Sequence, residues 1–189
     1  MCCRCAGGSH RVARSPGEGY GALGEHDEVV GRFQRASGWL RPVLFHSPYE
    51  AACWAIISLR VRQPIAARVR DELSRAHGAV LDVDGEELVG FPAPEQLLAI
   101  GQAPQLGDEK LRRLHGIARA ALDGRLDRER LLAAGREEAL TQLLELRGIG
   151  PFWAEGVFVR AVGPTDAPVL VERRLREAAA AAYHTPEVI

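Results

Sequence analysis

One short turn, residues 146–150, has a residue pattern with a clear chemical use. Gly148 and Gly150 flank Ile149, so the backbone can reach positive φ angles while the isoleucine plugs the space between two helices. Pro151 suits the first position of a helix, whose first amides then point outward. An amide-lined turn at a positive helix end can hold a phosphate group. The alternative is an ordinary glycine-containing corner between two helices.

Helical patterns elsewhere predict the elements that position this turn. Residues 137–146 and 151–162 carry apolar side chains at helical spacing and would form the two arms of a hairpin. Residues 47–50, Ser-Pro-Tyr-Glu, form a capping box that opens an almost wholly apolar helix at 51–59, expected to be the buried central helix. A clean amphipathic helix is predicted over 108–122. Few segments alternate with period two, so we expect an all-α fold.

The remaining segments predict one domain with a tail in front of it. Residues 1–26 are rich in Gly, Ser and Arg without periodicity, which indicates a disordered or atypical N-terminal tail. Residues 27–189 would form the helical domain. An irregular stretch with a turn is expected at 79–93. Shorter helices are predicted over residues 27–38, 64–78, 94–101 and 128–134, with an Ala-rich helix ending near Tyr183.

The composition of the 189-residue chain excludes some protein classes. The formal net charge of −1 argues against a large basic surface for non-specific nucleic-acid binding, although a compact contact through backbone amides does not need one. No apolar run is long enough to cross a bilayer and no secretory signal is evident. We therefore expect no membrane partner and a cytoplasmic location.

Three of the four cysteines stand together at the start of the chain, at Cys2, Cys3 and Cys5. A metal site there is one hypothesis, but adjacent residues splay apart and no fourth ligand is evident. The alternative is a disordered segment or a start codon assigned in the wrong place. Cys53 lies in the apolar helix, and no cofactor is expected.

Residues 146–154, Leu-x-Gly-Ile-Gly-Pro-Phe-x-Ala, resemble the helix-hairpin-helix segment of the DNA-3-methyladenine glycosylase II family. Glu155-Gly156 and Arg160-Ala161 extend the resemblance. Residues 40–57 resemble that family's first core helix, and residues 114–120 its helix before the hairpin. The resemblance covers roughly residues 27–185 and implies a two-lobed helical core. The sequence has no counterpart of the family's N-terminal β-rich lobe or of the family's further C-terminal helix. This difference indicates a short variant or a truncated gene model.

The resemblance implies base excision, in which a damaged base is flipped out of duplex DNA and its N-glycosidic bond is hydrolysed. This chemistry needs a carboxylate near the sugar to stabilise oxocarbenium-like charge. Where the family has this aspartate, the chain has Glu172, whose carboxylate lies one methylene further out. Asp166 is the backup candidate. The alternative for Glu172 is an acid favoured by a helix N-terminus, and for Asp166 a turn or capping role.

The resemblance also implies the other site residues. Aromatic side chains could stack on a flipped base, with core packing as their alternative role. The expected base pocket is Tyr49, Trp54 and Trp153. The expected contacts to the DNA backbone are Arg147, Gly148, Ile149, Gly150 and Phe152. A monovalent cation on the carbonyl oxygens of Leu146 and Ile149 is a further implied feature.

The positions of lysine and cysteine distinguish this chain from two kinds of related enzyme, those with lyase activity and those with an iron–sulfur cluster. Related enzymes that also cut the DNA backbone use a lysine two residues after the hairpin's last glycine, where this chain has Phe152. Lys110 is the only lysine in the sequence, so β-lyase activity is not expected. The C-terminal half has no cysteine, which excludes the iron–sulfur cluster of some relatives.

Three functional hypotheses follow for the chain. The first is a monomeric, monofunctional DNA glycosylase that removes alkylated purines of the 3-methyladenine type from double-stranded DNA. The second is a catalytically impaired helix-hairpin-helix module that binds DNA, which the change from aspartate to Glu172 favours. The third is a helical scaffold without a DNA role, for which the glycine turn would be a coincidence.

Overall fold

The computed structural model describes residues 18–39, 43–164, 167 and 171–185. The chain divides into two compact units. We call residues 44–175 the central unit, and residues 1–43 together with 176–189 the terminal unit. Helices dominate both units, and the described strands form a single two-stranded sheet. The prediction of an all-α fold is therefore confirmed, with this small sheet as an addition.

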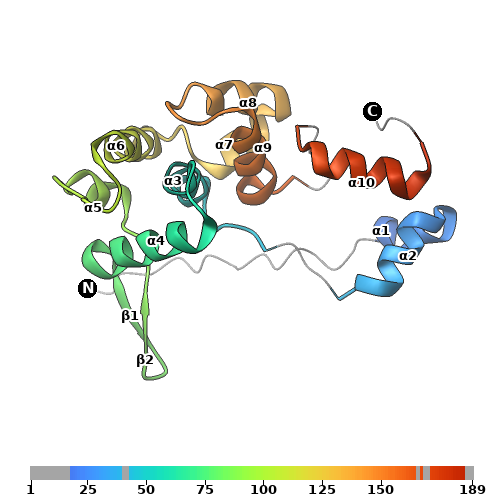
Figure 1. The fold of residues 1–189 in the computed structure, drawn as a ribbon, viewed down its shortest axis with the longest axis horizontal. Helices are drawn as coiled ribbons and strands as arrows, with labels where there is room; N and C mark the ends of the chain where they lie inside the picture. The colour runs from blue at the N-terminus through green and yellow to red at the C-terminus, as the bar shows by residue number, and fades with distance from the viewer. Residues whose placement is uncertain (1–17, 40–42, 165–166, 168–170, 186–189) are drawn as a thin grey trace. The chain divides into compact units, whose positions relative to one another are not determined.

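The central unit is built around α3 (Pro48–Ser58), whose side chains are mostly buried. Ser47 caps this helix, because its hydroxyl accepts a hydrogen bond from the Glu50 amide at 3.2 Å. Figure 1 shows α3 among neighbouring helices, and it packs against α4 (Gln63–His77), α6 (Asp108–Leu122) and α9 (Pro151–Val157). Both predicted helices, the buried one after the capping box and the amphipathic one at 108–122, are confirmed.

Shorter elements complete the central unit. The short helix α5 (Pro94–Leu98) packs on α6, whereas α7 (Arg128–Ala134) and α8 (Arg136–Leu144) pack on each other. The helix α9 continues into η1, a π-helical turn over Phe158–Val162 that is closed by a hydrogen bond from Gly163 N to Phe158 O at 3.0 Å. Such π-helical turns occur frequently at functional sites.

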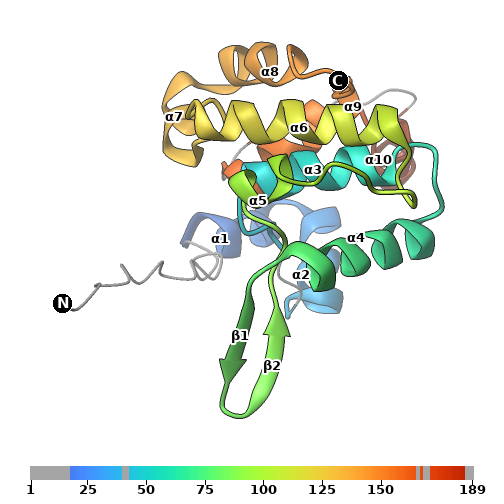
Figure 2. The same ribbon diagram turned by 90° about the vertical axis from the view of Figure 1, so that its left-hand side faces the viewer.

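A β-hairpin occupies the stretch that the sequence analysis expected to be irregular. Strands β1 (Val80–Val83) and β2 (Glu86–Val89) pair antiparallel, and Figure 2 shows them extending away from the helices of the central unit. Asp84 and Gly85 both have positive φ, at 54° and 83°, as the tight turn of a two-residue hairpin requires. Because the strands are largely exposed, they lack the apolar alternation that marks a half-buried strand.

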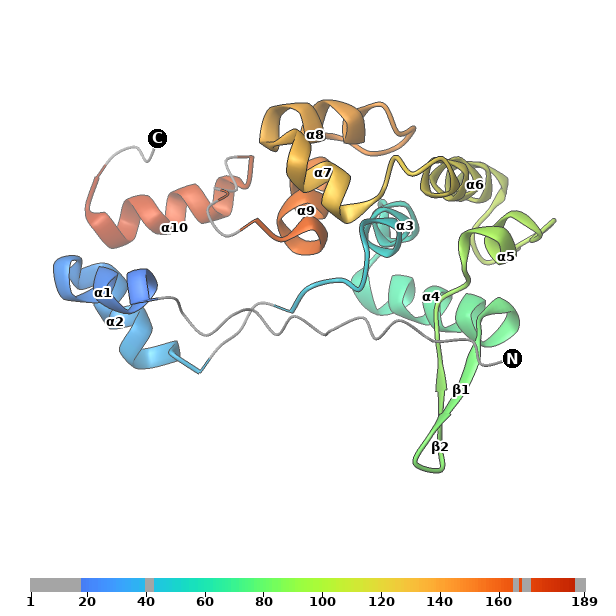
Figure 3. The same cartoon turned by 180° about the vertical axis from the view of Figure 1, so that it is seen from behind.

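The terminal unit contains α1 (Glu18–His26) and α2 (Glu28–Ser37), which pack together (Figure 3), and most of α10 (Arg173–Tyr183). A Cβ at Gly31 would lie 2.6 Å from the Gly24 carbonyl oxygen, so glycine permits this close approach. Asp27 caps α2 through the Val30 amide at 2.9 Å, and this bond, with one from the Tyr183 hydroxyl, lowers the pKa of Asp27. The helix α1 lies in a stretch that was expected to be a tail. The apolar side chains of this stretch show no helical periodicity, and the helix packs on α2.

Among the described residues, no helix combines the length and apolar character that crossing a lipid bilayer requires.

Candidate active site

The glycine turn joins α8 to α9 as a helical hairpin. Leu146 and Ile149 are both buried, each 5% exposed, and the Ile149 amide donates to the Leu146 carbonyl at 2.9 Å. Ile149 therefore fills the space between the two helices, as the sequence predicts. The Leu146 carbonyl, one of the two oxygens implied for a monovalent cation, takes part in closing the turn.

The two glycines of the turn serve different needs. Gly148 has a φ of +97°, and a Cβ there would lie 2.9 Å from Ile56 Cδ1 and 3.0 Å from Arg113 Cδ. Gly150 has a φ of −98°, which any residue can adopt, and a Cβ there would meet nothing within 4 Å. The fold thus requires a glycine only at position 148. The sequence-based expectation of positive φ angles holds for Gly148 and not for Gly150.

Gly148→Ala is expected to lower the free energy of unfolding by about 1–3 kcal/mol, because the backbone is left-handed and the methyl group is crowded. Urea unfolding followed by circular dichroism measures this difference. Gly150→Ala is the matched variant in the same turn and is expected to stay within about 0.5 kcal/mol of the wild type. Equal losses at both positions would contradict the distinction between the two glycines.

The outward side of the hairpin presents hydrogen-bond donors. The proline at the first position of α9 has no N–H, and the amides of Phe152 and Trp153 have no acceptor in the described part of the chain. Phe152 is 50% exposed and packs edge-to-face on Trp153, with ring centroids 5.4 Å apart. These groups form an exposed, donor-rich helix start of the kind that binds anions.

A cluster of arginines around Glu109 lies next to the turn. Glu109 accepts hydrogen bonds from Arg112 and Arg113, which hold its pKa below the usual range. Arg147, the exposed arginine of the turn, also approaches Glu109, with its Nη2 3.2 Å from Oε1. Glu109 therefore keeps the Arg147 guanidinium beside the hairpin, where it can add positive charge for an anionic ligand.

Glu172 lies immediately before α10, at the N-cap position. Its Oε1 accepts a hydrogen bond from the Arg174 amide at 3.0 Å, and the residue is half-buried. Glu172 therefore stands at a helix N-terminus, as its alternative role requires, and the bond that caps α10 also restricts where the carboxylate lies. Asp166, the backup candidate, lies outside the described residues.

A second acid, Glu155, was missed by the sequence analysis as a functional candidate. It lies on α9 and is 4% exposed. Its carboxylate accepts hydrogen bonds from Arg136 at the start of α8 and, at 3.2 Å, from the amide of Val171, the residue before Glu172. The available signal was its spacing: Glu155 stands between Ala154 and Val157 on the apolar face of this helix, where a charge is unexpected.

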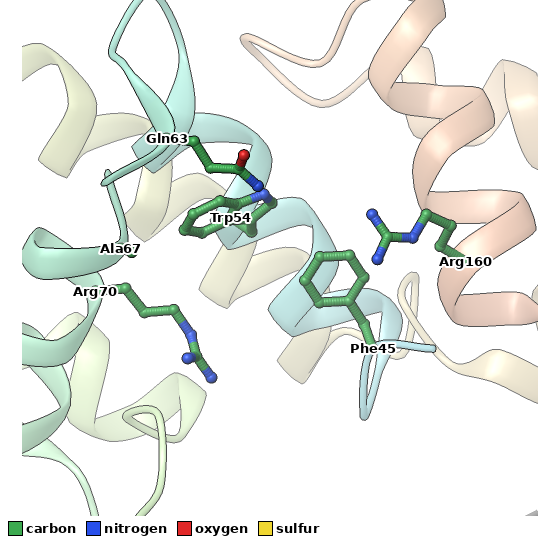
Figure 4. Close-up of a pocket in the computed structure, with 6 residues that line it drawn as sticks. All are labelled: Phe45, Trp54, Gln63, Ala67, Arg70 and Arg160. Atoms are coloured by element: carbon green, nitrogen blue, oxygen red, sulfur yellow. The ribbon is translucent and has the colours of Figure 1, made fainter. Parts of the chain in front are cut away.

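A cavity of about 300 Å³ lies beside α3 in the central unit (Figure 4). Trp54, one of the three expected pocket residues, lines it. The Arg160 guanidinium of η1 lies over the Phe45 ring, 5.0 Å from its centroid, as in a cation–π pair. The cavity thus combines aromatic faces with positive charge and a side-chain amide. Its lining residues are Phe45, Trp54, Gln63, Ala67, Arg70 and Arg160.

The other two expected pocket residues are not among the residues that line this cavity. Tyr49 is a core residue whose hydroxyl donates to the Pro92 carbonyl at 2.9 Å, and burial raises its pKa. Trp153 is half-buried and packs against Phe152 and the core. These contacts are what the core-packing alternative predicts for both residues.

No family model matches the sequence. One curated relative is a DNA-3-methyladenine glycosylase from Bacillus subtilis (strain 168), which is 28% identical over 136 residues. The match includes 69% of this chain and 45% of the relative, so the chain spans less than half the length of that protein.

Solved structures with the same fold cover nearly the whole chain. A 3-methyladenine DNA-glycosylase from Archaeoglobus fulgidus superposes with a TM-score of 0.70 at 23% identity, over 92% of this chain and 60% of that one. An 8-oxoguanine glycosylase/lyase from Clostridium acetobutylicum gives 0.73 at 21% identity in its apo form, over 93% and 62%. The fold is that of the helix-hairpin-helix DNA glycosylases. The resemblance noted from the hairpin motif is therefore confirmed.

Within this glycosylase fold, the side chain of the single lysine of the chain is bonded to the end of α3. Lys110 Nζ donates to the Ile57 carbonyl at the end of α3, at 2.7 Å, and partial burial lowers its pKa. Phe152 stands at the position expected for a lyase lysine. Among the described residues, no three His, Cys, Asp or Glu side chains gather as a metal site would require. Cys2, Cys3 and Cys5 lie outside the described residues.

Proposed function

We propose that this chain forms the helical core of a monofunctional DNA glycosylase, which hydrolyses the N-glycosidic bond of alkylated purines of the 3-methyladenine type in duplex DNA. The observation that carries the proposal is the hairpin: amides without an acceptor among the described residues stand at its outward side, and a Cβ at Gly150 would meet only open space, although the fold does not require glycine there. The names of the curated relative and of the Archaeoglobus structure support the 3-methyladenine class.

The hairpin would hold one phosphate of the DNA backbone. Amides at the start of α9 would donate to its oxygens, and the absence of a Cβ at Gly150 would let the phosphodiester come within hydrogen-bond distance. Arg147 would add charge from the same turn. A monovalent cation on the carbonyls of Leu146 and Ile149 stays a prediction. Because few phosphates would be neutralised, the near-neutral net charge of the chain is compatible with this mode of binding.

Glu172 would serve the sugar of the flipped nucleotide. As the glycosidic bond breaks, positive charge develops on the deoxyribose, and a nearby carboxylate stabilises that charge and orients the attacking water. The cap bond to the Arg174 amide would hold the carboxylate in a fixed position for this role. The role requires no metal or organic cofactor.

The cavity beside α3 would receive the flipped base. Trp54 offers aromatic surface for stacking, and alkylated purines with a positive charge on the ring bind well to electron-rich aromatic faces. Two guanidinium groups in the cavity would repel a cationic base. Arg70 has its Nη2 3.7 Å from Glu50 Oε2, and Arg160 lies over the Phe45 ring. Their arrangement would therefore affect which lesion is accepted.

The test is base release from duplex DNA that carries one defined lesion. Separate duplexes with 3-methyladenine, 7-methylguanine and 8-oxoguanine are incubated with the full chain, and free base is measured by mass spectrometry. We expect release of the methylated purines and not of 8-oxoguanine. Tight binding without release would favour the impaired binding module, and neither binding nor release would favour a scaffold without a DNA role.

The same reactions test for lyase activity. The abasic product is expected to stay uncut until alkali is added, and borohydride is expected to trap no protein–DNA adduct, because Phe152 replaces the Schiff-base lysine and Lys110 is engaged at α3. Denaturing gels with and without alkali measure strand scission. A borohydride-trapped adduct would contradict this expectation. If the adduct is absent in Lys110→Arg, Lys110 is the lyase nucleophile; if it persists in that variant, another amine is.

A further inference from the structure

Glu155 is a charged side chain in the core of the central unit, and the roles assigned above do not use it. Its side chain is 6% exposed, so the carboxylate has lost nearly all contact with water. Burial of an ionised carboxylate is costly unless the group is paired and hydrogen-bonded. The hydrogen-bond partners of the Glu155 carboxylate therefore indicate its role.

Two groups from different parts of the chain satisfy this carboxylate. Oε1 accepts a hydrogen bond from Arg136, the first residue of α8. Oε2 accepts a hydrogen bond from the main-chain amide of Val171 at 3.2 Å. Val171 directly precedes Glu172. One side chain on the second helix of the hairpin thus binds the start of the first helix and the backbone that carries the candidate catalytic acid.

We infer that Glu155 is a positioning residue, which holds Glu172 in place through the Val171 amide and does not itself contact the substrate. This inference rests on the proposed function, because it takes Glu172 to act on the deoxyribose. The bond from Val171 fixes the backbone before Glu172, and the bond from the Arg174 amide fixes its carboxylate. Glu155 would thus link the hairpin that would bind the phosphate to the acid that would act on the sugar.

Substitutions can separate the bond to Val171 from the cost of burying a charge. Glu155→Ala removes both bonds, whereas Glu155→Gln loses the ion pair with Arg136 and keeps an oxygen that can accept from Val171. Val171→Pro removes the amide donor, fixes the φ of residue 171 and leaves the ion pair with Arg136 intact, so it serves also if Glu155→Ala does not fold. Glu138→Ala removes an exposed acid of α8 and is the matched control.

Single-turnover base release at saturating protein measures the effect on chemistry. Glu155→Ala and Val171→Pro are each expected to lower the rate about 10- to 100-fold, the loss that follows when a catalytic group moves by about 1 Å. Affinity for a duplex with an abasic-site analogue is expected to change by less than about twofold, because the hairpin amides are untouched. Glu155→Gln is expected to retain most of the rate while it lowers the melting temperature, and Glu138→Ala to behave as the wild type.

Two further readouts test whether Glu155 acts through Glu172. In a Glu172→Gln background, Glu155→Ala is expected to cause no additional loss of rate, because the group that it positions is already gone. By NMR, the Val171 amide is expected to exchange with solvent faster in Glu155→Ala than in the wild type or in Glu155→Gln.

A Glu155→Ala rate equal to that of the wild type would overturn the inference, as would an equal additional loss in the Glu172→Gln background. A Glu155→Gln variant that loses as much rate as Glu155→Ala would also overturn it, since the bond to Val171 would then not be what matters. If the wild type released no base at all, that result would contradict the proposed function and, with it, this inference. An active wild type with an unaffected Glu155→Ala variant would contradict the inference alone.

Discussion

Glu172→Gln is expected to lower the single-turnover rate of base release about 100- to 1000-fold, the range measured when one preorganised electrostatic contact to a transition state is removed. The substitution removes the negative charge that would stabilise the developing oxocarbenium ion. It also keeps an oxygen that can accept the Arg174 amide, so the cap of α10 is retained. Rate and stability can thus be separated in one variant.

Two measurements accompany this prediction. The melting temperature of Glu172→Gln is expected to stay close to that of the wild type, which would exclude unfolding as the cause of lost activity. Glu172→Asp keeps the charge but moves it by one methylene, and we expect its rate to fall between those of the wild type and the glutamine variant. A glutamine variant as active as the wild type would show that another group serves the sugar.

Gly150→Ala is expected to weaken binding to duplex DNA at least about 10-fold, because a methyl group would keep the phosphate from one or more hairpin amides and each such charge-assisted bond is worth about 1.5–3 kcal/mol. The protein itself offers no obstacle to this methyl group, since nothing lies within 4 Å of the Cβ position. Fluorescence anisotropy with an abasic-site duplex at a fixed salt concentration measures the affinity.

Gly116→Ala is the control for this prediction. Gly116 lies on the exposed side of α6 and also has no atom within 4 Å of a Cβ position. The substitution is expected to leave DNA affinity unchanged and to stabilise the helix by about 0.5–1 kcal/mol. Unchanged affinity in Gly150→Ala would remove the hairpin as the phosphate site, even if the protein binds DNA elsewhere.

Local features of the sequence were sufficient to predict the elements of the hairpin and of the core. The capping box at Ser47 and the apolar spacing over 108–122 involve residues only a few positions apart, and the structure confirms both helices. Ile149 and Pro151 likewise have their roles set by immediate neighbours. The difference between Gly148 and Gly150 was not accessible in this way, because Ile56 and Arg113, which crowd Gly148, come from α3 and α6.

The remaining parts of the site depend on contacts between distant segments. Glu155 bonds to Arg136, 19 positions away, and to Val171, 16 positions away, and no local pattern specifies such pairs. The cavity beside α3 likewise combines Phe45 with Arg160. Sequence alone therefore determined most of the helices and the glycine turn, because these follow from local conformational preference, whereas Glu172 was proposed from the family resemblance and stays a prediction. Only the tertiary structure decided which acid is buried and what it holds, because the cost of burying a charge is met by partners that folding brings together.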